Sequence, residues 1–279
     1  MSAGKEGSVR AILYALGANF GIAVSKFGAA WWTNSGSMLA EAIHSTADCV
    51  NQLLLLLGMR EARRPESADH PLGHHRVTYF WSMIVALLLF FMGGAFSVYE
   101  GIERLRHPHP LENGLVALLV LGVAVVLEAF SLAGAMREIR KVAHGKPFLR
   151  WFRETRESEL MVVAGEDIAA LAGLTLAFCA VAAALATGNP LWDALGTISV
   201  GVVLMVIAVL VMIEVKGLIV GESASPELRE EIQTFVAGQP EVAEVLNVIT
   251  LAWGGQVVIA VKARMAGGEA ISGAQRVER

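Results

Sequence analysis

The residues with the most evident chemistry form a polar stripe inside an otherwise apolar stretch. Glu41, His44, Asp48 and Asn51 follow one another at spacings of three, four and three, which places them on one face of a helix. An imidazole and a carboxylate four residues apart can point at one ion, and together they suit Zn²⁺ and its transition-metal neighbours. The alternative is a polar seam that hydrogen-bonds to a neighbouring helix. The apolar surroundings favour metal binding by His44 and Asp48, with Glu41 and Asn51 supporting these ligands.

A second acidic group, Glu166-Asp167, lies among Ala and Gly residues in a later apolar stretch. Small residues let helices approach closely, and we expect Asp167 at a depth comparable to that of Asp48. Two carboxylates and a neutral imidazole balance a divalent cation, which still needs a fourth ligand. Glu166 and water are both candidates, because Glu166 lies roughly 100° around the helix from Asp167. Glu166 could instead be protonated, or paired with Lys26.

A third candidate is the histidine-rich run at 70–75. His70 and His74 could hold a metal between two apolar segments. The alternative is a solvated polar loop that caps the next segment, helped by Arg76. We assign no metal role to the other loop histidines, which are His107, His109 and His144.

The elements that position these residues follow from the composition. The chain is 55% hydrophobic and only 17% charged, whereas soluble domains usually carry about a quarter charged residues. Its mean hydropathy is +0.56. The composition therefore predicts an integral membrane protein. A membrane-spanning helix needs about 20 mostly apolar residues, and six stretches qualify: 9–30, 36–59, 77–101, 112–136, 160–186 and 190–214.

Several other classes of protein are excluded. Two distant cysteines, Cys49 and Cys179, do not make a disulfide scaffold or a Cys-rich zinc fold. A net charge of −4 and a pI near 6.0 argue against nucleic-acid binding.

We expect Lys26 to snorkel to the outer face and Asp193 to favour the start of a helix. Glu128 has no partner that the sequence reveals.

The orientation follows from the basic residues of the short loops. The loops at 60–76 and 137–159 are rich in Lys and Arg, and they alternate with loops that are poor in them. Four further basic residues fall on the same side: Lys5, Arg10, Lys216 and Arg229. Both termini are therefore predicted to be cytoplasmic. The small size and the lack of a targeting segment are typical of a bacterial inner membrane protein.

The tail changes character after about residue 215. Ser225 followed by Pro226 opens a predicted helix that runs to about Ala237. Two predicted strands follow, at 244–252 and 256–264, joined by Gly254 and Gly255. A last helix is predicted from Ser272, with Gln275 three residues later. We therefore predict a six-helix transmembrane domain over 1–215 and a small cytoplasmic α+β domain, in the order α-β-β-α, over 216–279.

Three ordered motifs carry a resemblance to a known family. The stretch at 35–48, Ser-Gly-Ser-Met-Leu-Ala-Glu-Ala-Ile-His-Ser-Thr-Ala-Asp, is similar to the second-span motif of the cation diffusion facilitators. The run at 70–76, His-Pro-Leu-Gly-His-His-Arg, is similar to that family's loop before the third span. The stretch at 221–229, Gly-Glu-Ser-Ala-Ser-Pro-Glu-Leu-Arg, resembles the start of its cytoplasmic domain.

The resemblance implies efflux of Zn²⁺ or a similar ion in exchange for protons, by a homodimer with metallochaperone-like cytoplasmic domains. It implies a site shared by the second and fifth spans, each giving two residues four apart. His44, Asp48 and Asp167 match these positions, but the fourth falls on Val163, which cannot ligate. This departure resembles a divergent subgroup similar to the ninth-type animal zinc transporters. It leaves open Mn²⁺, Fe²⁺, Co²⁺, Ni²⁺ and Cd²⁺ as alternatives to Zn²⁺.

Two further departures concern the family's other metal sites. His70 and His74 match the loop histidines of the family, but the usual acidic position holds Ser67 or Ala68. The candidate replacements are Glu66 and Asp69. The tail has no His or Cys after Cys179, so we expect no zinc-binding dimer site there, although the tail could dimerise by packing.

The rival functions are an enzyme and a non-transporting partner subunit of the same family. His70-xxx-His74-His75 resembles one histidine box of membrane di-iron enzymes, but such enzymes need several boxes and the chain has only 7 His. Glu41-xx-His44 also fits carboxylate-bridged di-iron bundles, which need a second copy that is absent. We therefore expect no enzymatic activity. The alternative of a partner subunit stays open because of Val163.

Overall fold

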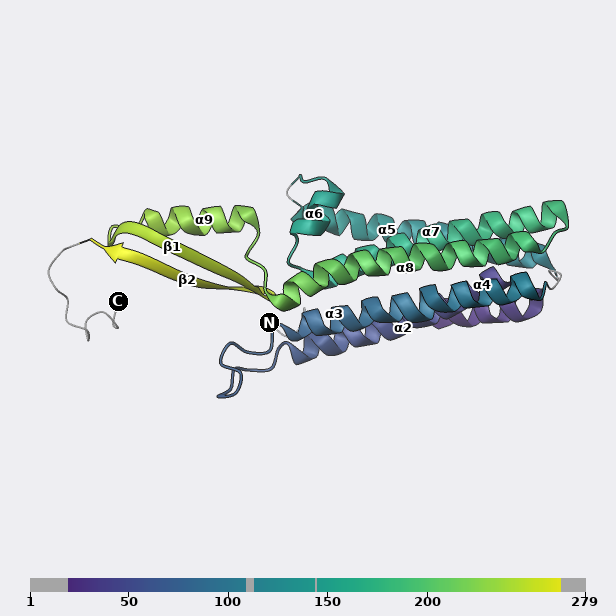
Figure 1. Cartoon of the computed structure of the whole chain (residues 1–279), viewed down its shortest axis with the longest axis horizontal. Coiled ribbons are helices and arrows are strands. Elements are labelled where there is room, and N and C mark those ends of the chain that lie inside the picture. Colours follow the sequence, from purple (N-terminus) through teal and green to yellow (C-terminus); the bar gives the residue numbers. More distant parts are fainter. Residues whose placement is uncertain (1–19, 109–112, 144, 267–279) are drawn as a thin grey trace.

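The structure is a computed structural model that describes residues 20–108, 113–143 and 145–266. Residues 20–33 are helical, and a bundle of long helices follows. The bundle helices are α2 (Gly36–Glu61), α3 (Val77–Leu88), η1 (Leu89–Ala95), α4 (Phe96–Arg106), α5 (Gly114–Val142), the short α6 (Phe148–Glu154), α7 (Ser158–Thr187) and α8 (Leu191–Val220). The tail consists of α9 (Pro226–Ala237), β1 (Val242–Trp253) and β2 (Gln256–Met265). Figure 1 shows the tail extending beyond one end of the bundle.

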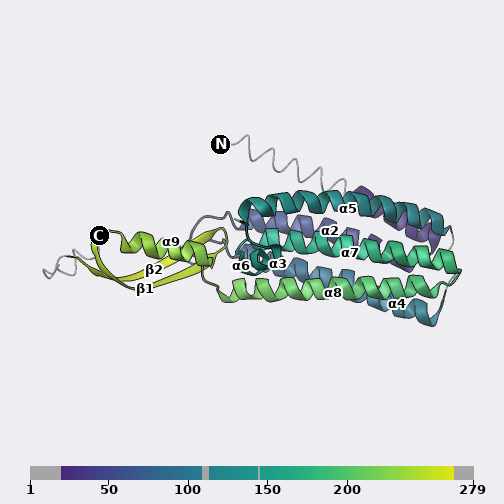
Figure 2. The same cartoon turned by 90° about the horizontal axis from the view of Figure 1, so that it is seen from above.

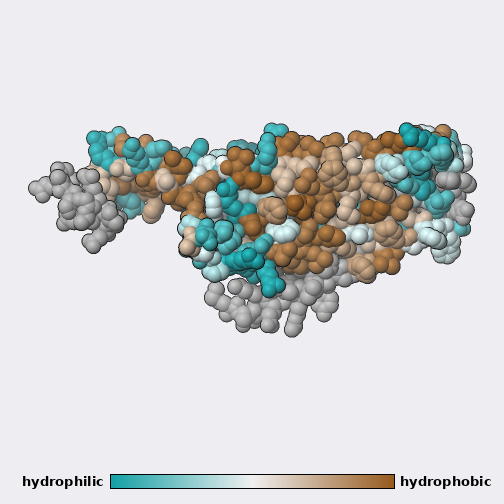
Figure 3. Space-filling view, turned by 60° about the horizontal axis from the view of Figure 1, so that its bottom comes forward, coloured by the Kyte–Doolittle hydropathy of each residue, from teal (hydrophilic) through white to brown (hydrophobic). Residues whose placement is uncertain are grey.

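The bundle has the dimensions and the surface of a membrane domain. Four helices are long and apolar enough to cross a bilayer: Val77–Arg106, Gly114–Lys141, Ser158–Thr187 and Leu191–Val220. They lie side by side in both views (Figures 1 and 2). The visible face of the bundle is mostly hydrophobic between two hydrophilic ends (Figure 3). The chain is thus an α-helical integral membrane protein with a small α+β tail, as its sequence predicts.

The predicted spans differ from the helices in two respects. Within the described residues, α2 is not among the helices that are apolar enough to cross a membrane, because its 26 residues include the polar stripe. The first predicted span is described only from residue 20. The count of six spans therefore stays a prediction. In addition, α8 continues six residues past the predicted end at 214 and stops only at Gly221, whose φ is +121°, a conformation that suits glycine.

The third predicted span is one long helix with a π-helical segment in its middle. Seven residues, Leu89–Ala95, adopt the wider π-helical turn between α3 and α4. Such segments are rare and frequently lie at functional sites. Here the segment faces the polar stripe, since a Cβ added to Gly93 would lie 3.5 Å from Nδ1 of His44.

The start of α2, which sets the position of the stripe, is held by a residue from another helix. Asp193, at the start of α8, is 3% exposed. Its carboxylate accepts hydrogen bonds from Ser35 Oγ (2.8 Å), Gly36 N (2.8 Å) and Ser37 N (3.4 Å). These donors include free N–H groups of the first helical turn. The prediction that Asp193 serves its own helix is incomplete, because it mainly caps α2.

The tail has the predicted helix and hairpin. Ser225 caps α9 by accepting a hydrogen bond from Leu228 N, and β1 and β2 pair in antiparallel fashion with Trp253 opposite Gln256. The strands are slightly longer than predicted. The turn contacts α3 and the loop before it, since Trp253 Nε1 donates to Leu72 O of the loop (2.9 Å) and Gly254 N to Tyr79 Oη of α3 (2.9 Å). The helix predicted from Ser272 lies outside the described residues.

At Gly201, α8 packs closely against η1 and α4, and a substitution there tests this packing. A Cβ on Gly201 of α8 would lie 2.6 Å from Gly94 O and 2.7 Å from Val98 N, both backbone atoms. Because backbone cannot move aside as a flexible side chain can, we expect Gly201→Ala to lower the free energy of unfolding by about 2 kcal/mol. Thermal unfolding in detergent measures it.

Gly134 of α5 provides the matched control. A Cβ added there has no atom of the described chain within 4 Å, so Gly134→Ala should keep or slightly raise stability. Equal melting temperatures for Gly201→Ala and the wild type would contradict the close packing of α8 against the third span.

Candidate metal site

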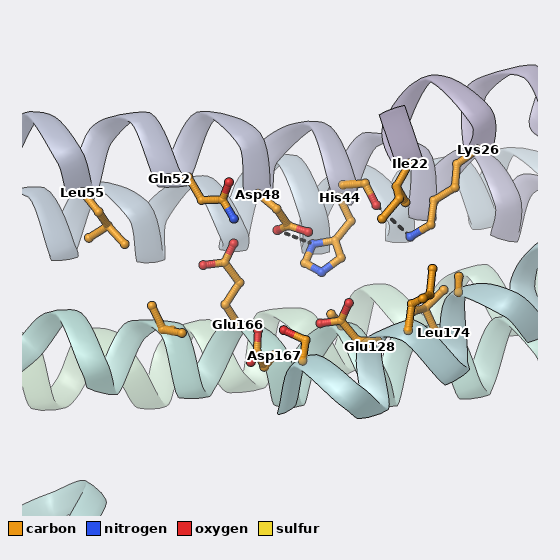
Figure 4. A pocket seen from close by; sticks show the side chains of 16 residues that line it. Ile22, Lys26, His44, Asp48, Gln52, Leu55, Glu128, Glu166, Asp167 and Leu174 are labelled. Carbon is orange, nitrogen blue, oxygen red and sulfur yellow. Dashed lines mark hydrogen bonds and ion pairs between the residues drawn. The ribbon is translucent and has the colours of Figure 1, made fainter. Parts of the chain in front are cut away.

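A cavity of about 180 Å³ lies inside the bundle, between the helix at 20–33, α2, α5 and α7. Its walls carry most of the ionisable residues of the membrane interior (Figure 4). The polar lining comprises Lys26, His44, Ser45, Asp48, Gln52, Glu128, Ser131, Glu166 and Asp167. Ionisable side chains are costly at this depth, so their concentration around one cavity indicates a functional site.

The polar stripe of α2 faces the bundle interior, as its spacing predicts. Glu41, His44 and Asn51 are at most 1% exposed. His44 Nδ1 lies 3.7 Å from Asp48 Oδ1, the contact dashed in Figure 4. In the described part of the chain, both ring nitrogens of His44 lack a hydrogen-bond partner, and so does Oδ1 of Asp48. Buried polar atoms are seldom left unpaired, and an imidazole beside a carboxylate provides two donors for a metal ion.

The acidic pair of α7 divides between two sides of the cavity. Glu166 reaches toward α2, opposite Gln52 and Asp48, whereas Asp167 lies on the side of Glu128 (Figure 4). Asn51 Nδ2 donates a hydrogen bond to Glu166 Oε1 (3.1 Å). Both acidic residues are partly buried. The structure therefore brings all four predicted ligands to one cavity, and it places Glu166 nearer to the His44 stripe than the sequence suggested.

The donors do not yet converge on a single point. Within the described ranges, no three His, Cys, Asp or Glu side chains lie close enough together to hold one ion. Val163, at the position where the family resemblance implies a ligand, lines the cavity with an apolar side chain. A bound ion would thus require these side chains to come closer together than they lie here.

Lys26 contradicts its predicted role. Rather than snorkelling, it is 4% exposed and donates a hydrogen bond to Ser45 Oγ (2.7 Å). Its Nζ also lies 3.3 Å from Glu41 Oε2. The suggested pair of Lys26 with Glu166 is not formed, because Glu41 and Ser45 lie directly across from Lys26 on α2. Snorkelling requires a free path to the membrane surface, and the bundle blocks it.

Sequence reasoning gave no site role to four polar residues of the lining, which are Ser45, Gln52, Glu128 and Ser131. Glu128 was noticed without a partner, and it lies near Asp167 on the side of the cavity opposite α2. Gln52 continues the α2 stripe four residues after Asp48, so its spacing was a usable signal. Ser131 lies three residues after Glu128 on α5, but a lone serine in an apolar helix rarely attracts attention.

The loop histidines lie together, at the end of the bundle that carries the tail. The rings of His70 and His74 are 4.3 Å apart between centroids, close enough for both to contact one ion. His70 is exposed and His74 is partly buried. His107 lies 3.6 Å from Glu103 on the surface, as befits an ordinary loop residue. His109 and His144 lie outside the described residues.

Both basic loops meet the tail, which agrees with the predicted sidedness. Arg76 lies over the ring of Trp253, 4.8 Å from its centroid. Arg156 pairs with Glu222 (2.8 Å), and Lys146 pairs with Glu227 (2.7 Å). The Lys146 ammonium lowers the pKa of the Glu227 carboxyl. The loops before α3 and before α7 therefore lie on the same side as the tail. Lys5 and Arg10 lie outside the described residues.

Comparisons with known proteins match most of the chain to one family. A family profile described as the cation efflux transmembrane domain matches residues 12–219. The chain is 35% identical over 222 residues to the mitochondrial proton-coupled zinc antiporter SLC30A9 of Xenopus laevis, covering 78% of this chain and 40% of that protein. It is 32% identical over 232 residues to metal tolerance protein C4 of Arabidopsis thaliana, covering 82% and 50%.

A bacterial relative matches a shorter part. The chain is 30% identical over 129 residues to the zinc transporter ZitB of Escherichia coli, covering 46% of this chain and 41% of that protein. The chain thus spans half or less of the length of these relatives.

Proposed function

This chain belongs to the cation efflux family, and we propose that it carries zinc out of the cytoplasm in exchange for protons. Cation efflux proteins are transporters, which agrees with the expectation that the chain is no enzyme. The observation that carries the proposal is the pair of the buried His44 and the partly buried Asp48, which line one cavity together with Glu166. Among the described residues, the ring nitrogens of His44 and Oδ1 of Asp48 have no hydrogen-bond partner. The similar SLC30A9 protein of Xenopus laevis is a proton-coupled zinc antiporter, which supports the choice of ion.

The ligand set that we propose is His44 and Asp48 from α2 with Glu166 from α7. Asp167 lies on the other side of the cavity, near Glu128, and adds a second acidic side chain to that side. Asn51 positions Glu166 through its hydrogen bond (3.1 Å). One imidazole and carboxylates with an open position for water match the ligands that Zn²⁺ takes in proteins. Mn²⁺, Fe²⁺, Co²⁺, Ni²⁺ and Cd²⁺ are tested as alternatives, because geometry and supply decide selectivity among such ions.

Transport then requires the cavity to open alternately to the two sides. Zinc enters from the cytoplasm, drawn by the carboxylates, and binds as α2 and α7 close on it. Rocking of the bundle exposes the ion to the outside. Protons then replace it, because metal and protons compete for the same imidazole and carboxylate atoms. The emptied, protonated cavity returns, which couples zinc movement to proton movement.

We extend the proposal to the arrangement of the whole chain. It comprises a transmembrane domain and a cytoplasmic tail, with the boundary near Gly221, where α8 ends. Both termini are cytoplasmic, in the inner membrane of a bacterium. The chain forms a homodimer, supported by exposed apolar side chains on the strands of the tail, which are Leu246, Ile249, Ile259 and Val261. His70 and His74 are a second candidate contact for metal.

Zinc-driven proton flux tests the function. Purified protein in liposomes with a trapped pH dye should give a proton signal on addition of Zn²⁺, and smaller or no signals with Mn²⁺, Fe²⁺, Co²⁺, Ni²⁺ and Cd²⁺. Empty liposomes are the control. Folded protein that gives no signal with any of the six metals would contradict transport and would favour a non-transporting partner subunit.

A further inference from the structure

The helix at 20–33 places a buried ammonium group at the edge of the candidate metal site. Lys26 Nζ is 2.7 Å from Ser45 Oγ and 3.3 Å from Glu41 Oε2. The side chain is 4% exposed and lines the same cavity as His44 and Asp48. A lysine ammonium has three donors and no lone pair. Lys26 therefore cannot ligate a metal ion itself, but it can control a neighbour that can.

That neighbour is Glu41, which has the chemistry of a metal ligand and lies one helical turn before His44. It precedes His44 by three residues, so both side chains lie on one face of α2. Glu-x-x-His pairs of this kind bind metals in helical bundles. Glu41 is fully buried, and within the described residues its Oε1 has no hydrogen-bond partner.

The Glu41 carboxylate is confined by its neighbours, and its contact with Lys26 is the one that a substitution could release. A Cβ on Gly173 of α7 would lie 3.0 Å from Glu41 Oε1, so α7 confines the carboxylate on one side. The ammonium of Lys26 holds the other oxygen, and Ser45 holds the ammonium. In this arrangement Glu41 neutralises Lys26 instead of joining His44 and Asp48.

We propose that Lys26 is a specificity-determining residue, which keeps Glu41 out of the coordination of the transported ion. The proposal rests on the proposed function, because it concerns the same site. Carboxylate oxygens suit hard ions such as Mn²⁺, whereas imidazole suits Zn²⁺ and its neighbours. Because Lys26 keeps one carboxylate away from the ion, imidazole makes up a larger part of the ligand set. This composition biases the site toward zinc.

Binding of Zn²⁺ and of Mn²⁺ to the purified full chain in detergent, measured by calorimetry, tests this role. The informative quantity is the ratio of the two dissociation constants. Lys26→Met frees Glu41, and we expect this variant to shift the ratio toward Mn²⁺ by about tenfold, the lower end of effects seen when groups around a metal site are removed. If only the loss of the ammonium charge mattered, the site would bind both ions more tightly by the same factor. The ratio of the two dissociation constants would then stay unchanged.

Three matched variants separate the carboxylate from the charge. Lys26→Arg keeps the cation and should keep the wild-type ratio. The double variant Lys26→Met with Glu41→Gln removes one charge of each sign, and it should restore the wild-type ratio. Glu41→Gln alone should also keep the ratio, because Glu41 does not ligate in the wild type. This last variant keeps the proposal testable even if Lys26→Met fails to fold.

The outcomes separate this inference from the proposed function. An unchanged ratio in a folded Lys26→Met variant that binds zinc would overturn the inference and leave the function standing. A changed ratio in Glu41→Gln, or a double variant that keeps the ratio of Lys26→Met, would also overturn it. Wild-type protein that binds no Zn²⁺ would instead contradict the proposed function itself.

Discussion

Asp48→Ala is expected to abolish zinc-driven proton flux, and His44→Ala is expected to do the same. Each variant removes one of two candidate metal ligands whose nearest atoms lie 3.7 Å apart. Within the described structure, the ring nitrogens of His44 and Oδ1 of Asp48 have no hydrogen-bond partner. A site of few protein ligands cannot compensate such a loss. Flux should fall by about a hundredfold or more, beyond the range for residues that only support ligands. The liposome assay with a trapped pH dye measures it.

The control is an acidic residue of the same chain that lies far from the cavity. Glu103 is on the exposed end of α4, with 46% of its side chain accessible, so Glu103→Ala should transport like the wild type. Flux near the wild-type level in Asp48→Ala, with protein shown to be folded, would exclude the α2 stripe as the metal site. Equal losses in Asp48→Ala and Glu103→Ala would point to a general effect of charge.

Asp193→Ala is expected to cause the largest loss of stability among the substitutions considered. The carboxylate is 3% exposed and accepts hydrogen bonds from Ser35, Gly36 and Ser37. Its removal leaves buried donors unpaired at the start of α2, and each such group costs about 1–3 kcal/mol. We expect a loss of about 3 kcal/mol in the free energy of unfolding, measured by thermal unfolding in detergent.

Asp193→Asn is the matched control for this prediction. An amide retains one oxygen, which can still accept from Ser35 and Ser37, whereas its nitrogen cannot accept from Gly36. We therefore expect an intermediate loss of stability. Melting temperatures of Asp193→Ala and the wild type that agree within error would show that Asp193 does not hold α2 in place.

The polar stripe could be predicted from the sequence because it depends on helical period alone. Glu41, His44, Asp48 and Asn51 needed only a helix and an apolar environment to share a face, and both follow from local composition. The helix α9 and the hairpin were predictable for the same reason, since caps, turns and strand residues are local signals. The family resemblance added the pairing of the second and fifth spans.

The partners of the charged residues were not predictable, because they come from other helices. Lys26 was expected at the membrane surface, but it pairs with Glu41. Asp193 was expected to serve its own helix, but it caps α2. In both cases the rotation of one helix against another decides the contact, and a single sequence does not contain that rotation.

The choice between Glu166 and Asp167 illustrates the same limit. Adjacent residues on a helix point about 100° apart, so only one of them can face α2 squarely. The sequence favoured Asp167 through its expected depth and the family resemblance, whereas the hydrogen bond from Asn51 directs Glu166 toward α2. The contacts of Trp253 with the loop before α3 and of Gly254 with Tyr79 of α3 likewise depend on the tertiary fold.

The position of the bound ion tests the central claim most directly. Anomalous scattering at the zinc edge, from crystals of the full chain grown with Zn²⁺, locates the ion without any assumption about its ligands. We predict zinc inside the bundle, bound by His44 and Asp48 together with Glu166, at nitrogen and oxygen distances of about 2.0–2.2 Å. Zinc found only at His70 and His74, with none in the cavity between α2 and α7, would contradict the account.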